Sequence, residues 1–581
     1  MPSTLAATHL DLGANLSGDR CTFRVWAPNA QKLDLRLRDH NDDHEMRRER
    51  GDIFSIQLQA RAGGKYFYIV DGGQPVPDPV SRSLPEGVHG PTEIIDPENF
   101  DWSDNKWRGV AQRDAIIYEL HVGTFTPSGT FDAVIERLDH LKKLGVTMLE
   151  LMPIAAFPGE HNWGYDGVSP YAVQASYGGP AGLKRLVNAA HRAGLGVMLD
   201  VVYNHLGHEG NYLRLFGPYF ISRHQTPWGD AINYDGPGSE GVRRYIIENA
   251  LYWIREYHLD GLRLDAVQTI YDDSPRHILA EVQERVQSLA QDLGRHVLVI
   301  AETDANDPKL IRPSKERGYG LDAVWSDDFH HAIHALFTGE RSGYYQDFGQ
   351  PQQIARTLEQ GFCFTGELFK FWGKPRGAPP TGIPLERHVF CIQNHDQVGN
   401  RAKGERLSHL LPFGACKVAA ALLLLAPETP LLFMGEEHAE TAPFQYFTSY
   451  GDRELARAVS EGRRREFKDF SWDEVPDPQD PATFERSKLH WEQATEDNEM
   501  LRWYRSLIAL RRKYFTGAAR TCRAEILHEN SIRVELFAAG RNLILMASLK
   551  PGATLPALDP DSTLLLQNSQ DGFDLTVSAE Q

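Results

Sequence analysis

The sequence predicts an α/β protein, a (β/α)8 TIM barrel with an N-terminal β-sandwich domain and a small C-terminal β domain. Three observations support this fold class. Apolar and polar side chains alternate through much of the first hundred residues, as they do in antiparallel strands. From about residue 114, short apolar runs alternate with amphipathic stretches of helical length. After about residue 515 the strand-like alternation returns.

The N-terminal region is expected to form a small antiparallel, immunoglobulin-like sandwich over residues 1–98. Its apolar residues recur with a period of two in four runs, which Gly and Asn/Asp turns separate. These runs are Phe23–Val25, Leu33–Leu37, Phe54–Leu58 and Tyr66–Val70. The next segment, Pro75–Pro97, contains several prolines and glycines, and this composition predicts a linker.

The central region, residues 111–515, is expected to form the barrel. Its candidate strands are Ala115–His121, Val146–Ile154, Gly196–His205, Gly261–Val267, His296–Thr303, Ala323–Phe329, His388–Asp396 and Thr429–Glu437. The runs MLELMPI, VMLDVV and VLVIAE within them are apolar almost throughout, as parallel strands covered on both faces are. Eight strands in strict alternation with helices favour a closed barrel over an open doubly wound sheet.

Helical patterns lie between the candidate strands. They cover residues 131–144, residues 183–190, Ser239–His258, His277–Gly294, Pro412–Ala426 and Met500–Tyr514. In the first two, apolar residues recur every three to four positions and end before Gly145 and Gly194, which are natural C-terminal stops. These patterns supply the helices that a barrel needs between its strands.

Two connections within the barrel are too long to be simple loops. They are Leu206–Gly238 and much of Thr338–Arg387, and in barrels such βα loops form the functional face. After the last helix, apolar residues alternate again around Val534 and in the run Leu543–Met546. This pattern predicts that residues 516–581 form a C-terminal β-sheet domain.

Charge and cysteine content narrow the functional classes. With 61 Lys and Arg against 79 Asp and Glu, the net charge is −18. This charge disfavours nucleic acid, gives no reason to expect membrane binding, and fits a neutral substrate. The five cysteines are scattered, odd in number and without a C-x-x-C pair, so neither a disulfide framework nor a structural zinc site is indicated.

The sequence predicts neither a secretory signal nor a membrane span. The N-terminal run MPSTLAATHLDLGANL lacks a basic start and a continuous apolar core. The longest aliphatic run, Val418–Ala426, is far shorter than the ~20 residues that a membrane-spanning helix needs. We therefore expect a cytoplasmic protein.

Polar and charged residues gather where the candidate strands end. They are Asp200, Asn204 and His205 at the third strand, Arg263 and Asp265 at the fourth, Glu302 at the fifth, Asp327 and Asp328 at the sixth, and His395 and Asp396 at the seventh. A charge inside a buried strand is costly unless it is paired, so any one of these residues could be a structural ion pair. The whole set, on the rim where the strand ends converge, predicts a functional site.

This set of residues suits the cleavage of a glycosidic bond. A retaining enzyme holds two carboxyls roughly 5–5.5 Å apart, one as nucleophile and one as general acid. Arg263 precedes Asp265 by two residues and faces the same side of the strand, so its charge keeps Asp265 ionised. Glu302 is then the expected acid, with a pKa raised by neighbouring carboxylates and desolvation. His205 and His395 can donate hydrogen bonds to sugar hydroxyls.

Four motifs, in order, resemble those of glycoside hydrolase family 13, the α-amylase superfamily. They are DVVYNH (Asp200–His205), GLRLDAV (Gly261–Val267), AETD (Ala301–Asp304) and QNHDQVGN (Gln393–Asn400). The resemblance implies a retaining α-glycoside hydrolase with Asp265 as nucleophile, Glu302 as acid/base and Asp396 as transition-state stabiliser. The run CTFRVWAPNA (Cys21–Ala30) is similar to the N-terminal sandwich of branching and debranching enzymes, which implies a domain like a carbohydrate-binding module.

Longer segments distinguish families within this superfamily. YELHVGTFTPSGTFDAVIERLDHLKKLG (Tyr118–Gly145) and WGYDG (Trp163–Gly167) occur both in branching enzymes and in trehalose-releasing hydrolases. TPWGDAINYDGPGS (Thr226–Ser239), QNHDQVGNRAKGERL (Gln393–Leu407) and FMGEEHAETAPFQYFT (Phe433–Thr448) resemble the maltooligosyltrehalose trehalohydrolase family. That resemblance implies cleavage of the α-1,4 bond next to the terminal trehalose of maltooligosyltrehalose. It also implies a pathway with a maltooligosyltrehalose synthase, which makes this substrate.

The resemblance also implies substrate-binding residues. They are Tyr165, Asp200, His205, Trp228, Arg263, Gln268, Asp328, His330, His395, Gln397 and Arg401. Tyr165 is expected to form a platform under the sugar that is cleaved. Trp228 and Tyr234, in the long third βα loop, are candidates for recognising the trehalose end. Gln268 stands where we expect histidine in this family. The difference affects the details of sugar binding at this position and not the reaction that is catalysed.

Neither a metal nor a cofactor is expected. Asn204 matches a calcium-binding position of many α-amylases, but the sequence shows no second cluster of oxygen ligands. Two alternative functions remain open. A glycogen branching enzyme has the same catalytic trio and differs in whether water or a sugar hydroxyl accepts the glycosyl group. A catalytically inactive glucan-binding protein is disfavoured, because the three carboxylates, Arg263 and both histidines are all present.

Overall fold

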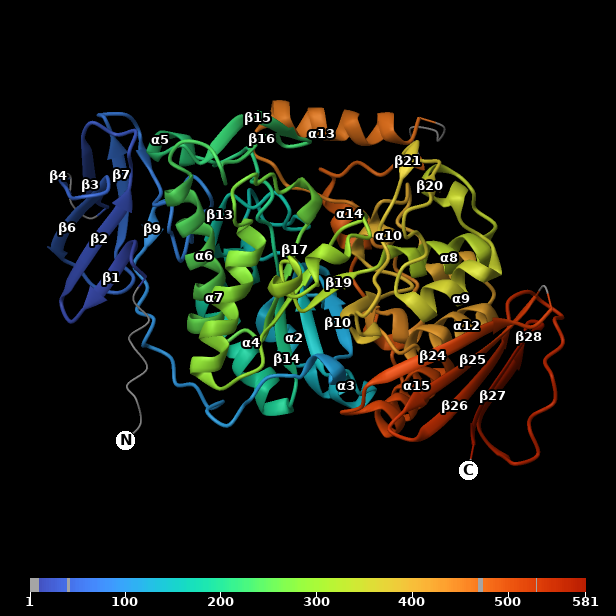
Figure 1. Cartoon of the computed structure of the whole chain (residues 1–581). Coiled ribbons are helices and arrows are strands. Elements are labelled where there is room, and N and C mark those ends of the chain that lie inside the picture. Colours follow the sequence, from blue (N-terminus) through green and yellow to red (C-terminus); the bar gives the residue numbers. More distant parts are fainter. Residues whose placement is uncertain (1–9, 39–41, 469–473, 529, 581) are drawn as a thin grey trace.

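The computed structural model describes residues 10–38, 42–468, 474–528 and 530–580, and it places three parts along the chain (Figure 1). An N-terminal β-rich part and a C-terminal β-sheet lie at opposite ends of a central barrel. This is the predicted fold class, with its parts in the predicted order. Within the described ranges, none of the helices combines the length and the apolar character that crossing a membrane requires.

The N-terminal part is a sandwich of two sheets, as predicted. The first sheet has the order β1 (Gly13–Ser17), β2 (Arg20–Trp26), β6 (Ile53–Gln59) and β5 (Arg47–Arg48). The second has the order β4 (Asp43–Glu45), β3 (Leu33–Leu37), β7 (Lys65–Val70) and β8 (Pro75–Val76), with β9 (Thr92–Glu93) paired to β7. Apolar residues of the alternating pattern, such as Phe23, Leu35 and Tyr66, are completely buried between the sheets.

The segment Pro75–Pro97, predicted to be a linker, belongs instead to the sandwich. β8 and β9 lie inside it and both pair with β7. Between them Asp78 is buried, and its Oδ2 accepts a hydrogen bond of 2.7 Å from the Tyr66 hydroxyl. The prolines and glycines of this segment form turns between buried residues, whereas those of a linker would be exposed to solvent.

The connection between sandwich and barrel follows this segment, and a buried ion cluster fixes it to the barrel. His191, on α4 (Gly179–Ala193), lies between two acids: Nδ1 is 2.8 Å from Asp104 Oδ2 and Nε2 is 2.8 Å from Asp260 Oδ2. Trp107 Nε1 donates a hydrogen bond of 2.7 Å to the other oxygen of Asp260. Asp260 directly precedes a barrel strand, so the cluster, here called the base clamp, ties the connection to the N-terminal end of the barrel.

Eight parallel strands close the barrel in sequence order. They are β10 (Ile117–Leu120), β11 (Met148–Leu151), β14 (Gly196–Val201), β17 (Gly261–Leu264), β18 (Leu298–Ala301), β19 (Ala323–Trp325), β22 (His388–Phe390) and β23 (Thr429–Phe433). All eight predicted strands are confirmed, but each observed strand ends before its predicted range does. The polar residues that follow each strand leave the hydrogen-bonded ladder and turn over the mouth of the barrel.

The predicted helices surround these strands. They are α2 (Phe131–Ile135), α3 (Leu138–Leu144), α4, α6 (Ser239–Glu256), α7 (Ile278–Leu293), α12 (Phe413–Leu424) and α15 (Glu499–Phe515). The single helix expected over residues 131–144 is broken into α2 and α3. The break lets both halves bury apolar residues, Phe131 and Val134 in the first and Leu141 and Leu144 in the second.

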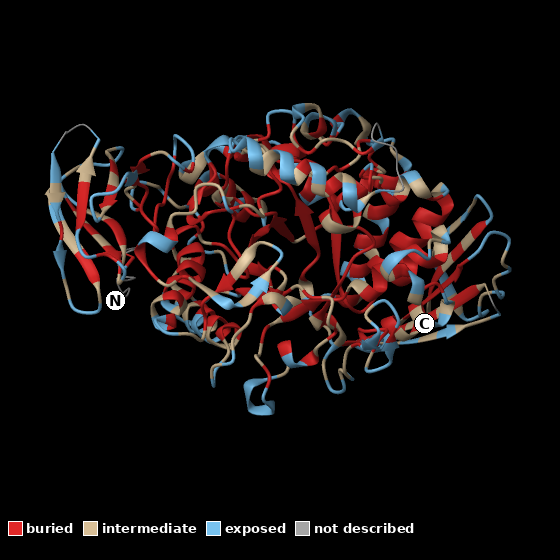
Figure 2. Cartoon of the chain, turned by 90° about the horizontal axis from the view of Figure 1, so that it is seen from above, coloured by how far each residue is buried: buried red, intermediate tan, exposed pale blue. Residues whose placement is uncertain are grey.

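The long connections gather at the C-terminal end of the barrel strands. The third connection contains the hairpin of β15 (Phe220–Thr226) and β16 (Gly229–Ile232), and the sixth contains α9 (Pro351–Gln360), β20 (Leu368–Phe369) and β21 (Lys374–Pro375). A helix that we did not predict, α13 (Arg453–Glu466), crosses the same end (Figure 1). Seen from above, it is largely exposed over a buried core (Figure 2).

The C-terminal part is the predicted β-sheet. Its antiparallel strands have the order β24 (Arg520–Ile526), β25 (Ser531–Ala538), β26 (Arg541–Ser548), β28 (Phe573–Glu580) and β27 (Ser562–Gln570). The sheet packs against α12, where Lys417 Nζ donates to Asn568 Oδ1 at 3.1 Å and to Gln570 Oε1 at 3.0 Å. α12 is buried on nearly every side, as an apolar helix between a barrel and a sheet must be.

Candidate active site

A cavity of about 450 Å³ opens at the C-terminal mouth of the barrel. Its walls bring together all three predicted catalytic acids, although these come from three different strand ends. The lining residues are Trp163, Tyr165, Asp166, Trp228, Asp265, Ala266, Gln268, Glu302, Asp396, Asn400, Tyr446, Val459, Arg463 and Glu466. Aromatic faces, carboxyls and amides in one cavity suit a ligand with both apolar ring faces and hydroxyls.

Arg263 holds the acids of neighbouring strands in place. Its guanidinium is completely buried, and Nη1 donates to Asp200 Oδ2 at 2.9 Å and to Asp265 Oδ1 at 2.7 Å. Asn204 Nδ2 donates to the second oxygen, Asp265 Oδ2, at 2.7 Å. Because a fixed cation and an amide donor occupy both carboxylate oxygens, Asp265 is held in one position at the edge of the cavity.

Glu302 has the environment of a general acid. Burial raises its pKa to about 8, and Asp265 adds to this shift while Arg263, with Nη2 3.5 Å from Glu302 Oε2, opposes it. The carboxyl accepts a hydrogen bond of 2.6 Å from the backbone N–H of Ala266. Ala266 adopts a left-handed conformation (φ 39°, ψ 51°), and this turn after Asp265 aims its N–H at Glu302. Glu302 is therefore protonated near neutral pH.

Tyr165, Asp200 and His395 form a hydrogen-bonded chain beside the cavity. The Tyr165 hydroxyl donates to Asp200 Oδ2 at 2.6 Å and lies 2.7 Å from His395 Nε2. A hydroxyl that donates to a carboxylate can accept from an imidazole, so Nε2 carries a proton toward it. On its far side, the His395 ring contacts Glu119 of β10, a residue that the sequence analysis did not select.

His205 and Trp228 act together. Their rings are stacked at 3.7 Å with an angle of 9° between the planes, and Trp228 lines the cavity. His205 Nε2 lies 2.8 Å from the backbone oxygen of Tyr165, and Nδ1 contacts Asn204 Oδ1. Both ring nitrogens of His205 thus face protein groups, and its contact with a sugar stays a prediction. Gln268 is exposed and lines the cavity, and its contact with a sugar also stays a prediction.

Asp328 is not accessible to a substrate, contrary to our prediction. It is completely buried, its Oδ2 accepts from Asn306 Nδ2 (2.7 Å) and from two backbone N–H groups, and Arg376 pairs with its Oδ1 at 2.9 Å. The preceding residue, Asp327, interacts instead with Glu302 and Asp396. Both acids lie in the first turn of α8 (Asp327–Thr338), where consecutive residues point to different sides.

Other predicted residues also lie outside the cavity lining. His330 is 2 % exposed and packs among His331, His334 and Tyr345, so a sugar contact there is wrong for this structure. Tyr234 is buried, and its hydroxyl donates to the backbone oxygen of Tyr203 at 2.6 Å, which makes it a core residue. Gln397 is partly buried, and Arg401 pairs with Glu340 at 2.9 Å. For these last two, substrate contact stays a prediction.

The helix α13 adds three lining residues that the sequence analysis missed, Val459, Arg463 and Glu466. Arg463 Nη2 donates to the backbone oxygen of Gly399 at 2.6 Å, which ties the helix to the segment after Asp396. Asp452 caps this helix, and an acidic cap before an amphipathic run was the signal that could have revealed it. No local pattern indicated that it would cross the barrel mouth.

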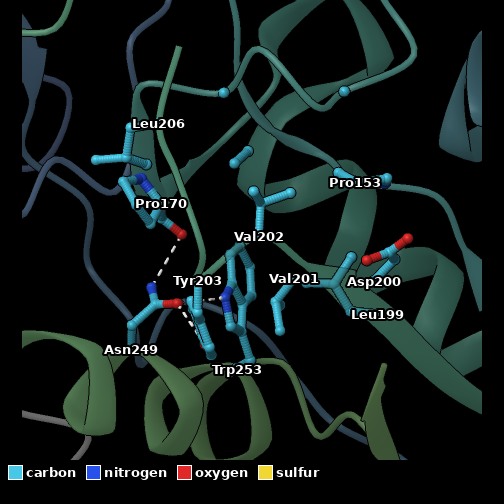
Figure 3. Close-up of a pocket in the computed structure, with 13 residues that line it drawn as sticks. Pro153, Pro170, Leu199, Asp200, Val201, Val202, Tyr203, Leu206, Asn249 and Trp253 are labelled. Atoms are coloured by element: carbon cyan, nitrogen blue, oxygen red, sulfur yellow. Dashed lines mark hydrogen bonds between the residues drawn. The ribbon is translucent and has the colours of Figure 1, made fainter. Parts of the chain in front are cut away.

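A second, much smaller cavity of about 20 Å³ lies behind Asp200 (Figure 3). Beside it, Asn249 of α6 accepts hydrogen bonds from the Tyr203 hydroxyl (2.7 Å) and from Trp253 Nε1 (3.1 Å). The same amide donates to the backbone oxygen of Pro170 at 2.9 Å. This satisfied buried network fixes the end of β14 against α6, and so fixes the strand that carries Asp200.

Among the described residues, one group of three has ligand atoms close enough for a metal. His224, Asp235 and Asp273 place these atoms within 4.8 Å of one another, but Arg223 already lies 2.6 Å from Asp235 Oδ1. At the position that binds calcium in many α-amylases, Asn204 turns its amide nitrogen to Asp265 and its oxygen to His205. In both places protein groups occupy positions that a cation would need.

Comparisons with known proteins agree with this geometry. The family described as alpha amylase, catalytic domain, matches residues 94–217, and carbohydrate-binding module 48 (isoamylase N-terminal domain) matches residues 11–95. A malto-oligosyltrehalose trehalohydrolase of Saccharolobus solfataricus is 48% identical over 506 residues, which cover 87% of each chain. That of Arthrobacter ramosus is 49% identical over 500 residues, covering 84% of this chain and 87% of the relative.

A solved structure and a more distant relative complete the comparison. The structure of an alpha amylase candidate from Salmonella typhimurium superimposes with a TM-score of 0.91 at 41% identity, covering 99% of this chain and 100% of that one. A 1,4-alpha-glucan branching enzyme of Corynebacterium jeikeium is 29% identical over 359 residues, covering 55% of this chain and 50% of the relative. The trehalohydrolases therefore share a higher sequence identity with this chain than the branching enzyme does, and the similarity covers more of the chain.

Proposed function

The chain belongs to the malto-oligosyltrehalose trehalohydrolase family, and we propose that its cavity carries out the reaction of that family. The enzyme is a glycosidase that hydrolyses the α-1,4-glucosidic bond next to the terminal trehalose of malto-oligosyltrehalose, which releases trehalose and a malto-oligosaccharide. The observation that carries this proposal is the pairing of Asp265 and Glu302 around one guanidinium. Arg263 contacts both carboxyls, yet Glu302 keeps a pKa of about 8.

This pairing supports a two-step retaining mechanism. In the first step Asp265 attacks the anomeric carbon while the protonated Glu302 donates its proton to the glycosidic oxygen, and trehalose leaves. In the second step the Glu302 carboxylate takes a proton from water, which attacks the glycosyl ester and frees Asp265. Two inversions retain the α configuration. Asp396 lines the same cavity, and its proposed role is to stabilise the positive charge that develops on the sugar ring.

The aromatic and amide groups of the cavity supply sugar contacts in this proposal. The Tyr165 ring stacks on His395 and lines the cavity, and it is proposed to lie against the sugar that is cleaved. Trp228, held by its stack on His205, and Gln268 are proposed to recognise the trehalose end. A malto-oligosyltrehalose synthase would supply the substrate, and the cytoplasmic location expected from the sequence is part of the same proposal.

A product assay tests the proposed reaction. The purified protein is incubated separately with malto-oligosyltrehalose and with maltopentaose, and products are separated by chromatography. We expect fast release of trehalose from the first substrate and little action on the second. Rapid cleavage of maltopentaose would assign the enzyme to the amylase group, and longer branched products from amylose would assign it to the branching enzymes.

A further inference from the structure

A buried carboxylate behind His395 has no role in the mechanism above. Glu119, at the end of β10, is 1 % exposed and contacts His395 twice. Its Oε2 accepts from the backbone N–H of His395 at 3.0 Å, and its Oε1 accepts from the ring Nδ1. A carboxylate enclosed in a barrel is costly unless its partners compensate for the lost water, so this pair of contacts calls for an explanation.

We propose that Glu119 is a positioning residue for the hydrolysis, which fixes the His395 ring in one orientation and keeps it positively charged, with Nε2–H directed at the hydroxyl of Tyr165, a residue that lines the cavity. The proposal rests on the function proposed above, in which Tyr165 lies against the sugar that is cleaved. Glu119 itself does not contact the substrate.

The geometry explains the orientation. One carboxylate binds both the backbone and the ring of the same histidine, so the ring cannot turn without breaking a buried hydrogen bond. With Nδ1 held in this way, Nε2 lies 2.7 Å from the Tyr165 hydroxyl and 3.6 Å from Asp396 Oδ1. A carboxylate behind an imidazole and acceptors in front of it form an arrangement that orients the ring and stabilises its cationic form.

The surrounding charges explain the protonation. The titratable groups that face His395 are Glu119 on β10, His121 after β10, Glu150 on β11, Asp200 on β14, Arg263 on β17, Tyr165, and Asp396 on its own helix. Burial lowers the pKa of His395, but Glu119 and then Asp396 outweigh burial and raise it to about 9, against the opposing charge of Arg263.

Glu150 provides a matched control. It stands directly opposite Glu119 in the register of β10 and β11 and is equally buried. Neither of its carboxyl oxygens has a hydrogen-bond partner among the described residues, and burial raises its pKa well above the usual range. Replacing Glu150 with glutamine therefore removes no hydrogen bond among the described residues and keeps the shape of the side chain.

The test compares Glu119→Gln with Glu150→Gln. We expect Glu119→Gln to lose roughly tenfold to a hundredfold in kcat, by analogy with carboxylates that orient metal-bound histidines. The alkaline limb of its pH profile should also move to lower pH, because the ring loses the charge that holds its proton. Glu150→Gln should keep the wild-type rate and profile. An unchanged profile in Glu119→Gln, or the same shift in both variants, would overturn the proposal.

A second measurement depends neither on the Glu119 and Glu150 variants nor on a substrate. Nitrogen-15 NMR of the histidine-labelled wild-type enzyme reports the protonation of each ring, and His395 is identified by the signal that His395→Gln lacks. We expect both ring nitrogens of His395 to be protonated at about pH 7.5. A neutral ring there would overturn the proposal even if Glu119→Gln failed to fold. Failure of trehalose release by the wild type would instead contradict the proposed function alone.

Discussion

Arg263 shows how one side chain gives two neighbouring carboxyls different tasks. It donates to Asp265 at 2.7 Å, whereas its nearest contact to Glu302 is 3.5 Å. The closer acid is held by the cation, and the more distant one stays under the influence of burial and of the acids around it. Sequence reasoning reached this pair because both residues end adjacent barrel strands. It could not separate Asp327 from Asp328, because their difference depends on the first turn of α8.

The raised pKa of Glu302 predicts an alkaline limit to activity. Only the protonated carboxyl can donate to the glycosidic oxygen, so kcat/KM should fall as the pH rises through about 8. Glu302→Gln should lower kcat by roughly 10²- to 10⁴-fold, because the amide has no proton to give. Both effects are read from initial rates of trehalose release across the pH range. A wild-type rate that continues to rise above this pH would contradict the assignment of the acid.

Variants of Asp327 and Asp328 should have different effects, with Asp327 variants changing activity and Asp328 variants changing stability. Asp328→Ala leaves the buried Arg376 without its acid and should lower the free energy of unfolding by about 3–5 kcal/mol, measured by urea denaturation. Asp327→Asn should leave that free energy nearly unchanged. Because Asp327 raises the pKa of Glu302, its loss should move the alkaline limit of activity to lower pH. If Asp328→Ala were fully stable, its structural role would be disproved.

At the scale of elements, α13 differs from every helix that we predicted. Its only buried residues are Ser460 and Arg463, and polar contacts hold it over the mouth. Arg463 donates to the backbone of Gly399, Ser460 donates to Asp477, and Glu209 accepts from the backbone N–H of Asp452. A helix with so little apolar contact adds little to the hydrophobic core. Its main contribution is to form part of the cavity wall.

Removing the anchor of α13 should therefore affect binding more than folding. We expect Arg463→Ala to raise KM for malto-oligosyltrehalose about tenfold, as the loss of a hydrogen bond from a charged group would. The melting temperature should change little, and limited proteolysis within α13 should become faster. Arg457→Ala, on the exposed part of the same helix, is the matched control. Equal behaviour of the two variants would show that the anchor has no such role.

At the scale of the whole molecule, the base clamp joins the N-terminal sandwich to the barrel. Burial lowers the pKa of His191, but its hydrogen bonds to Asp104 and Asp260 outweigh burial and raise it. The opposite holds for Asp104, where burial raises the pKa but His191 and His258 lower it strongly. The histidine and aspartate of the base clamp are therefore both charged only in the pH range where His191 is protonated and Asp104 is ionised.

This charge state predicts how stability depends on pH. A raised histidine pKa contributes stability that is complete below about pH 6.5 and is lost as the pH rises through the folded value. A lowered aspartate pKa contributes stability that is complete above about pH 4 and is lost in more acidic solution. His191→Gln should thus cost about 1–3 kcal/mol between these limits and less at higher pH, by urea denaturation. A difference that does not change with pH would contradict a charged clamp.

The whole molecule also shows which features a sequence can specify. The barrel strands were predictable because parallel strands covered on both faces are apolar runs, and the catalytic acids because strand ends converge. Pro75–Pro97 was misassigned because prolines and glycines mark turns equally in linkers and in packed loops. His330 and Tyr234 were misassigned because motif positions do not say which face of an element meets the cavity.

The placement of the two terminal β domains has a practical consequence. β1 and β28, the first and last described strands, lie on the two terminal β domains, away from the helix α13 that spans the mouth (Figure 1). A resin, a surface or a fused protein attached to the outer face of either terminal β domain would therefore leave the opening facing the solution. The fold thus suits immobilisation in a flow reactor, where long dissolved oligosaccharides must reach the enzyme from the side opposite its support.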